Sequence, residues 1–383
     1  MPTRIFAFFQ HWPPYSGAAA LRGRSILLGL RDRDAAGETS LHVRTTTPDP
    51  VEFDRIEVET LPVGELENSE GIVKRVLGEL RIGWIAAREI LGKSGGCELL
   101  IISMPAYLAG IVLSFRARRK RVPYVLEVRD VYPQVYAGAG LIKRGSLIYR
   151  FFTRLSRRAY ENAAAVVVAT RGLERVVRED APKANVQCVY NGFPGDFLTR
   201  SGDKHERFTA CFHGVMGFFQ DIETLIAVAR ELAQHDVDVV VIGYGRQESL
   251  LRGDVPANLR FLGRLPFEQT IETIERCHLG LCLRKDDPIS RDAFPVKTWE
   301  YLGLGMPSIV TPHCEAGAFL EEKGCGFQLE SGNVEAIVGQ VLALKNNADA
   351  LAALAARCRT VGADYTRKRL GAKAAEVFAN TIR

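Results

Sequence analysis

The chain has 383 residues, which is too long for one ordinary hydrophobic core and suits two domains of roughly 190 residues each. Its 47% hydrophobic and 25% charged residues are those of a soluble globular protein. No apolar run approaches the roughly 20 residues that a membrane-spanning helix needs, and the N-terminus lacks the small-residue cleavage site of a signal peptide. The eight cysteines include no C-x-x-C pair. We therefore expect free thiols in a reducing cytoplasm, and neither zinc nor a redox centre.

Strand-like apolar runs alternate with helical-period segments along the whole chain, which indicates parallel sheets flanked by helices. The first series of expected strands lies at 4–9, 40–45, 56–61, 97–103, 123–128, 164–170 and 186–190, with helices that include 71–92 and 145–162. Segment 191–207 is rich in glycine, proline and charge, and is expected to be the interdomain linker. A second series of strands is expected at 208–213, 238–243, 259–263, 279–283 and 307–311.

This pattern predicts an α/β protein with two Rossmann-like, doubly wound domains, 1–192 and 193–365, that face a central cleft. Open α/β sheets bind ligands beyond the carboxyl ends of their strands. The final helix, 366–383, has an Ala and Leu spacing suited to packing on another element. The sequence does not say on which domain it packs, and the N-terminal domain is one alternative.

The segment 284–311 holds the densest group of residues suited to chemistry. Residues 296–304 are expected to form a helix that starts at Pro295, and a helix N-terminus attracts phosphate. Arg284, Lys285 and Lys297 add positive charge, while Asp292 and Glu300 place two carboxylates within reach of sugar hydroxyls. The same pattern also fits a well-capped helix with no ligand, and the residues alone leave both alternatives open.

This segment resembles the signature of family-four retaining glycosyltransferases of the GT-B fold, and specifically the bacterial O-antigen and capsule branch. The matching residues, in order and spacing, are Pro295, Lys297, Glu300, Tyr301, Leu302, Gly305 and Pro307. The resemblance implies that Glu300 holds the donor ribose and that Asp292, where the family has Glu, lies near the transferred sugar. Together with Arg129, they are the predicted catalytic residues, and Phe294 joins the predicted donor-binding set.

Other stretches resemble the same family. Residues 13–22 resemble its glycine loop, which implies that Gly17 approaches the donor phosphate, and 258–266 match a turn near the nucleotide base. Residues 127–134 resemble the stretch at the acceptor site. In the second domain, Gln220 stands where many relatives place basic residues, so Arg284 and Lys285 would have to neutralise more charge. The implied residues are Arg129 and Asp130 on the acceptor side and Gly214, Gly217, Gln220 and Gly243 on the donor side.

The resemblance implies transfer of a sugar, with retention of configuration, from a nucleotide diphosphate donor. A UDP-sugar is favoured, and the acceptor is a glycan or polyprenyl-linked molecule in surface polysaccharide assembly. No cofactor or metal is expected, because no D-x-D sequence stands in a context that would hold Mg²⁺, and the one at 32–34 lies after a helix on the expected outer surface. The alternatives are a GT-B sugar-nucleotide epimerase, which needs no acceptor, and a non-catalytic subunit that binds nucleotide sugars.

Between Phe115 and Tyr160 the chain has twelve basic and two acidic residues. The expected helix 145–162 combines an apolar stripe with arginines on its other face, which suits the inner face of the plasma membrane. A core helix with a solvated basic face is the alternative, and no nucleic-acid-binding motif is present. The residues predicted to face the membrane are Arg118, Arg119, Lys120, Arg150, Arg154 and Arg157.

Overall fold

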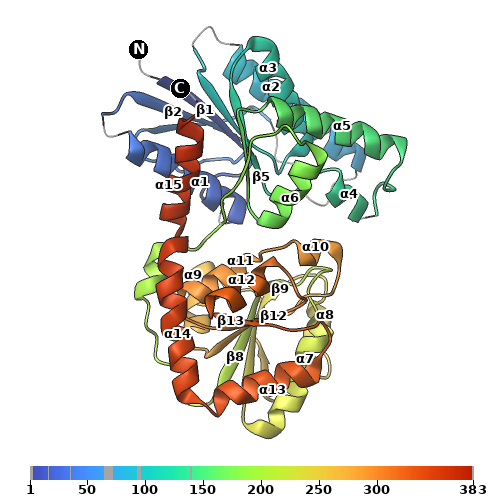
Figure 1. Ribbon diagram of the computed structural model, residues 1–383, viewed down its shortest axis with the longest axis vertical. Coiled ribbons are helices and arrows are strands. Elements are labelled where there is room, and N and C mark those ends of the chain that lie inside the picture. Colours follow the sequence, from blue (N-terminus) through green and yellow to red (C-terminus); the bar gives the residue numbers. More distant parts are fainter. Residues whose placement is uncertain are drawn as a thin grey trace. The chain divides into compact units, whose positions relative to one another are not determined.

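The structure is a computed structural model of the chain, and it describes residues 3–15, 17–34, 36–63, 72–92, 96–138 and 140–381. The chain divides into two compact units, which Figure 1 shows. The first unit comprises Met1–Asn191 together with Arg367–Arg383, and the second comprises Gly192–Thr366. The predicted boundary between residues 192 and 193 therefore falls beside the point where the chain first leaves the first unit.

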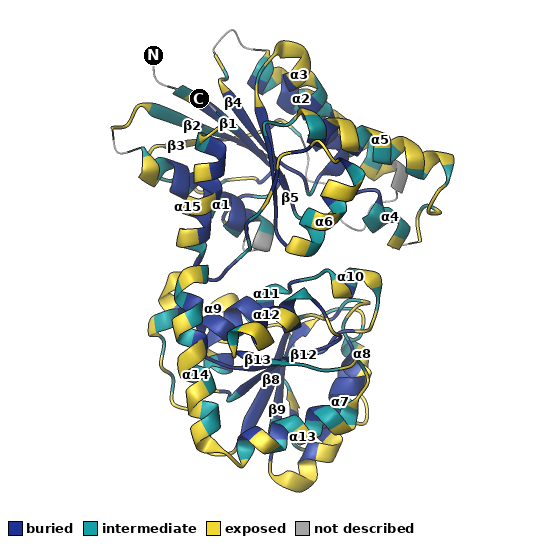
Figure 2. Cartoon of the chain, in the orientation of Figure 1, coloured by how far each residue is buried: buried dark blue, intermediate teal, exposed yellow. Residues whose placement is uncertain are grey.

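A seven-stranded parallel sheet forms the centre of the first unit, in the order β3-β2-β1-β4-β5-β6-β7. Strands β4, β5 and β6 are buried at every residue, as expected for parallel strands covered on both faces (Figure 2). The strand order reverses between β1 and β4. The strands are β1 (Thr3–Phe9), β2 (Thr39–Thr45), β3 (Ile56–Thr60), β4 (Leu99–Ser103), β5 (Tyr124–Val128), β6 (Ala165–Val168) and β7 (Val186–Cys188).

The last helix of the chain, α15, packs on α1 of the first unit (Figure 1). A Cβ atom on Gly29 would lie 2.6 Å from the backbone of Gly371, and one on Gly371 would lie 2.2 Å from the carbonyl oxygen of Ser25. The two glycines thus allow the close approach of the helices. The helices of this unit are α1 (Ala18–Arg33), α2 (Ile72–Leu91), α3 (Tyr107–Lys120), α4 (Gln134–Gly138), α5 (Leu147–Asn162), α6 (Arg171–Asp180) and α15 (Arg367–Ala379).

The second unit is built on a six-stranded parallel sheet in the order β10-β9-β8-β11-β12-β13. Its strands are β8 (Thr209–Val215), β9 (Asp238–Tyr244), β10 (Leu259–Phe261), β11 (Leu279–Cys282), β12 (Ser308–Val310) and β13 (Gly326–Gln328). Its helices are α7 (Ile222–Leu232), α8 (Glu248–Leu251), α9 (Phe267–Glu275), α10 (Pro288–Arg291), α11 (Val296–Gly303), α12 (Glu315–Lys323), α13 (Val334–Lys345) and α14 (Ala348–Gly362), with 3-10 turns η1 (Gly195–Thr199), η2 (Ala233–His235) and η3 (Ala363–Tyr365).

The strands expected from the sequence all form, with small shifts at their ends, and the helices expected at 71–92, 145–162 and 296–304 form as α2, α5 and α11. The edge strand β13 was not predicted. Its three residues, Gly-Phe-Gln, carry too little apolar pattern to be recognised in the sequence.

The expectation that 191–207 is an interdomain linker is wrong for most of that segment. From Gly192 onwards it belongs to the second unit, where Phe193 and Phe197 are fully buried. Phe193 packs against Gly303, since a Cβ atom there would lie 2.3 Å from the phenyl ring. Two buried aromatic side chains thus anchor a segment whose glycine, proline and charge content suggested a linker.

Candidate functional site

Two loops meet at the carboxyl edge of the second sheet, where the strand order reverses between β8 and β11. The backbone N–H of Lys285, after β11, donates to the carbonyl oxygen of Phe219, after β8, at 2.9 Å. Beside this bond, Gln220 and Arg284 form an antiparallel bridge. Open α/β sheets bind ligands at such a reversal point, so the two loops define the candidate site.

Helix α11 is held against this edge by Tyr301. The Tyr301 hydroxyl lies 3.3 Å from the carbonyl oxygen of Cys211 on β8 and 3.4 Å from that of Leu281 on β11. Gly280 leaves room for the ring, because a Cβ atom at that position would lie 2.4 Å from it. The Tyr and the Gly thus hold α11 beside β8 and β11.

Lys297, in the first turn of α11, is buried at the centre of the site. Its Nζ donates a hydrogen bond to Oε1 of Gln220 at 3.1 Å and lies 3.6 Å from the ring centroid of Phe212. Gly214, with φ of 119°, has no side chain to fill the space beside this ammonium group. Burial, reinforced by the charge of Arg284, lowers the pKa of Lys297 to about 8. An anion bound here would favour the charged form.

Glu300 lies one turn further along α11, against His213 of β8. The His213 Nε2 atom is 3.4 Å from Oε2 of Glu300, and the imidazole meets the ring of Tyr301 edge-on. Burial and the charge of Lys297 lower the pKa of His213 to about 3, so the ring is neutral at physiological pH. His213 was not among the predicted site residues. The signal in the sequence was its position directly before Gly214.

Arg284 and Asp292 flank the short helix α10. Arg284 is buried, its Nε donates to the hydroxyl of Ser290 at 3.2 Å, and its backbone N–H donates to the hydroxyl of Thr311 at 3.0 Å. Asp292 is the half-buried C-cap of α10. Lys285, predicted to neutralise phosphate, has an exposed side chain. The structure therefore brings Arg284, Lys297 and Gln220 together and leaves Lys285 at the rim.

The ring of Phe294 does not belong to this group. It stacks on Trp299, with centroids 4.0 Å apart and planes 10° apart, and meets Phe319 edge-on. The ring is 5% exposed. The ring of Phe294 is therefore packed in an aromatic cluster, and its expected donor contact stays a prediction. The sequence could not show the whole cluster, because Phe319 lies outside the motif.

The remaining donor-side glycines have different surroundings. A Cβ atom on Gly243 would lie 2.0 Å from the carbonyl oxygen of Gly214, so these two strand ends need glycine to approach each other. Gly217, in the loop after β8, has open space around it. In the first unit, Gly17 is the N-cap of α1 and packs beneath the ring of Tyr15.

The predicted acceptor-side residues follow β5. Arg129 Nε lies 3.4 Å from Oε2 of the buried Glu127, and Asp130 is exposed. Glu127 also accepts a hydrogen bond from Arg22 of α1. Neither Glu127 nor Arg22 was predicted, although both lie inside the segments that resemble the family.

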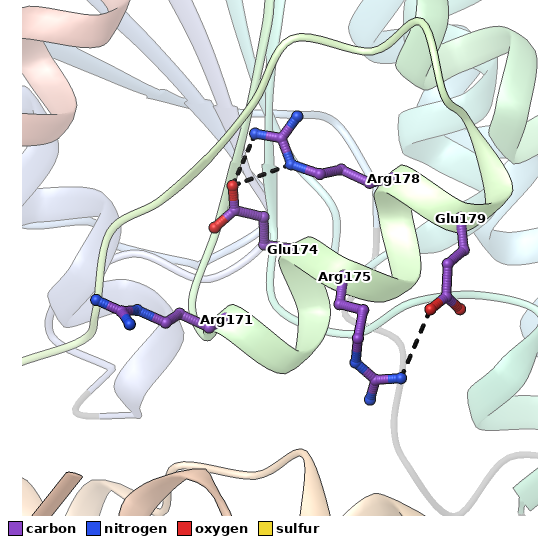
Figure 3. Close-up of a pocket in the computed structure, with 5 residues that line it drawn as sticks. All are labelled: Arg171, Glu174, Arg175, Arg178 and Glu179. Carbon is purple, nitrogen blue, oxygen red and sulfur yellow. Dashed lines mark hydrogen bonds and ion pairs between the residues drawn. The ribbon is translucent and has the colours of Figure 1, made fainter.

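An open hollow lies on α6, directly after β6 (Figure 3). Its lining residues carry alternating charges that pair along the helix. Glu174 accepts two hydrogen bonds from Arg178, at 3.1 and 2.7 Å, and Arg175 lies 3.6 Å from Glu179. The pairing is that of a solvated helix face, and we assign no binding role to it.

The apolar side chains of α5 are exposed near the start of the helix and buried near its end. Near its start, the side chains of Leu147, Ile148 and Phe151 are 82%, 58% and 58% exposed, whereas near its end Ala159 and Tyr160 are buried in the core. The six basic residues predicted to face a membrane are all exposed. Within the described ranges, no helix has both the length and the apolar content to cross a bilayer.

This architecture, with two doubly wound parallel sheets, is the GT-B fold. Sucrose-phosphate synthase from Thermosynechococcus elongatus is similar with a TM-score of 0.76, at 14% identity over 99% of this chain and 98% of that one. The glycosyltransferase WaaG has a TM-score of 0.70, at 14% identity over 98% and 99%. HepE from Anabaena has a TM-score of 0.68, at 14% identity over 99% and 100%. At these identities the likeness shows the fold alone.

Two family models match successive parts of the chain. The model described as "Glycosyl transferase 4-like domain" matches residues 10–192, and "Glycosyl transferases group 1" matches residues 197–361. The chain belongs to the family-four type of GT-B glycosyltransferases. The probable glycosyltransferase WbjE of Pseudomonas aeruginosa is 25% identical over 222 residues, which are 53% of this chain and 55% of that relative. The alignment thus spans little more than half the length of the relative.

Proposed function

We propose that the chain transfers a sugar from a nucleotide diphosphate donor, with UDP favoured, to a glycan or polyprenyl-linked acceptor in surface polysaccharide assembly. The observation that carries this proposal is the meeting of Lys297 with Gln220, and of Glu300 with His213, at the edge between β8 and β11. The relatives support it: HepE is described in complex with UDP and glucose, and WaaG as involved in lipopolysaccharide biosynthesis. No observation favours the epimerase or the non-catalytic subunit.

In this proposal the donor diphosphate lies beside Lys297 and Arg284. Both cations are buried, which makes their interaction with a phosphate stronger than it would be in water. Gly214 gives the phosphate room next to the ammonium group, and the first N–H groups of α11 add the positive end of the helix dipole. These groups supply the charge stabilisation that the departing diphosphate needs, so we propose that no metal is required.

Glu300 accepts hydrogen bonds from the ribose hydroxyls, while Asp292 lies near the transferred sugar. The neutral His213 leaves the Glu300 carboxylate as an acceptor for these hydroxyls, because the imidazole carries no charge to compete for it. Tyr244 offers an exposed aromatic face for the base, and the guanidinium of Arg264 lies 4.6 Å from its ring centroid. Arg264 belongs to 258–266, the segment expected to lie near the base.

The reaction replaces one bond at the anomeric carbon. The glycosyl–phosphate bond breaks as an acceptor hydroxyl attacks from the same face, and the hydroxyl proton passes to the departing phosphate. Configuration is therefore retained. Arg129 and Asp130, beyond β5, face the acceptor in this scheme. Positive charge that develops at the anomeric carbon is stabilised by the diphosphate, and that diphosphate is in turn held by Lys297 and Arg284.

The start of α5 is the proposed contact with an anionic membrane surface. Exposed apolar side chains at Leu147, Ile148 and Phe151 lie among the exposed arginines Arg150 and Arg154. Apolar groups of this kind enter the headgroup region, and each basic residue near an anionic surface adds about 1 kcal/mol of attraction. A peripheral position suits an enzyme whose acceptor has a lipid carrier.

Side-by-side calorimetric titration with UDP and GDP tests the donor assignment. We expect UDP to bind more tightly than GDP, and binding of neither nucleotide would overturn the proposal. Incubation with a UDP-sugar separates the enzyme classes: a transferase releases UDP quickly only when an acceptor is supplied, whereas an epimerase needs none. The anomeric configuration of the product, read by NMR, tests retention.

A further inference from the structure

Two arginines and one carboxylate gather at the carboxyl edge of the first sheet. Arg22 of α1 donates from Nε to Oε1 of Glu127 at 2.7 Å, and the hydroxyl of Ser103 donates to Oε2 at 2.6 Å. Arg129 Nε lies 3.4 Å from the same Oε2 atom. The side chains of Arg22 and Glu127 are 5% and 1% exposed, whereas that of Arg129 is 15% exposed. Arg129 is therefore the member that solvent reaches.

The two guanidinium groups have more donors than this cluster uses. Nη1 of Arg22 donates to the carbonyl oxygen of Tyr190 at 2.9 Å. The Nη2 atoms of Arg22 and of Arg129 are buried, yet neither has a hydrogen-bond acceptor in the described part of the chain. Buried donors in proteins are almost always paired with protein, water or ligand, so this cluster is equipped to hold a further acceptor.

The cluster also has an excess of positive charge. Burial alone would raise the pKa of Glu127, but Arg129, Arg22 and the Ser103 hydroxyl together hold it below its ordinary value. Glu127 is thus ionised at neutral pH and balances one arginine. Asp130 follows in sequence: desolvation by the surrounding protein raises its pKa, and the charge of Arg129 only partly opposes this. Among the described residues it forms no ion pair within 4.0 Å with either arginine.

The position of the cluster is that of a ligand site. Ser103 ends β4, Glu127 lies on β5, and Arg22 lies on the helix that follows β1. Strands β1 and β4 are neighbours, and the strand order of the first sheet reverses between them. This is the place where open α/β sheets form their binding crevice.

We propose that Arg129, supported by Arg22 and anchored by Glu127, binds a phosphate group of the acceptor substrate. The planar guanidinium presents paired N–H donors whose spacing matches two phosphate oxygens. Glu127 and Arg22 are positioning residues, because Glu127 contacts Arg129 and Arg22 in turn holds Glu127. The assignment to the acceptor rests on the proposed function. A phosphate of the donor has the same chemistry, and titration of pyrophosphate into the UDP-saturated chain distinguishes the two.

The test is a calorimetric titration of inorganic pyrophosphate into the full chain saturated with UDP. We expect one pyrophosphate to bind per chain, at least tenfold more weakly in Arg129→Gln and with intermediate affinity in Arg129→Lys. Arg88→Gln, at an exposed position on α2, is the matched control and should stay within twofold of the original chain. Unchanged binding in Arg129→Gln, or complete competition between UDP and pyrophosphate, would overturn the proposal.

If Arg129→Gln does not fold, the double variant Glu127→Gln, Arg129→Gln tests the same loss of pyrophosphate binding. In this variant no buried carboxylate is left without its partner. If UDP itself does not bind, the donor proposal fails and pyrophosphate is titrated into the free protein. Loss of binding in Arg129→Gln but not in Lys297→Met then still supports this site. Loss only in Lys297→Met overturns it.

Discussion

Lys297 and Gln220, 77 positions apart in the sequence, are joined by a hydrogen bond of 3.1 Å at the centre of the candidate donor site. The lysine comes from α11, the second helix after β11, and the glutamine from the loop after β8. Many relatives are expected to have basic residues near position 220. Here the ammonium group of Lys297 reaches Gln220 from α11 and supplies positive charge beside a loop that has no basic residue at 216–221.

Replacing Lys297 by methionine should weaken UDP binding by about 10- to 100-fold, because a hydrogen bond to a charged group contributes about 1.5–3 kcal/mol. Calorimetry measures the loss. The control is Lys368→Met, at an exposed position on α15, and its affinity should not change.

The same lysine predicts a pH dependence. Its pKa is about 8 in the free protein, and a bound diphosphate raises it. UDP binding at pH 9 should therefore take up close to one proton, and UDP affinity should fall as pH rises above 8. At pH 6.5 no proton should be taken up by this residue. Titrations in buffers of different ionisation enthalpy measure the uptake, and uptake that persists in Lys297→Met would exclude Lys297 as its source.

Glu300→Ala should lower both donor affinity and turnover at least tenfold, since the ribose hydroxyls lose their charged acceptor. Glu300→Gln retains the shape and should lose less. Glu335→Ala, at an exposed position on α13, is the matched control. Near-normal activity of Glu300→Ala would reject the role assigned to Glu300.

His213 should make the protein sensitive to acid. Its pKa is about 3 in the folded chain and near 6.5 when unfolded, so the unfolded state binds a proton first as pH falls below 6.5. The resulting loss is about 1.4 kcal/mol per pH unit. Between pH 7.5 and 5.0 the free energy of unfolding should fall by about 2 kcal/mol more in the original chain than in His213→Gln. Equal losses in urea titrations would show that His213 is not buried in its neutral form.

Two glycine substitutions should have opposite effects on stability, one at the contact between α1 and α15 and one on an exposed face of α13. Gly371→Ala should destabilise the first unit by about 1–3 kcal/mol, because the new methyl group meets the backbone of Ser25. Gly339→Ala, on an exposed face of α13 with open space around it, should stabilise its helix by about 0.5–1 kcal/mol. Chemical unfolding measures both, and an equal effect of the two would contradict the packing.

Membrane binding should depend on both the apolar and the basic side chains of α5. The protein should float with phosphatidylglycerol vesicles at low salt, and less with phosphatidylcholine vesicles or at high salt. Exchanging Leu147, Ile148 and Phe151 for serine should abolish flotation, whereas Phe267→Ser, at an exposed position in the second unit, should not. Failure to float at low salt would end the membrane proposal.

The order of strands and helices could be predicted from the sequence because buried parallel strands leave continuous apolar runs such as those of β4 and β6. The motif on α11 likewise identified Lys297 and Glu300. What the sequence could not show depends on distant contacts: the packing of Phe294 on Phe319, the approach of His213 to Glu300, and the buried pair of Arg22 and Glu127. Phe193 in the expected linker is a further example, since only its burial beside Gly303 places it in the second unit.

A crystal structure of the protein with UDP tests the central claim most directly. We expect the diphosphate within hydrogen-bond distance of the Lys297 ammonium group and at the first turn of α11, with both ribose hydroxyls donating to the carboxylate of Glu300. UDP bound away from the edge between β8 and β11, or a ribose without contact to Glu300, would contradict it.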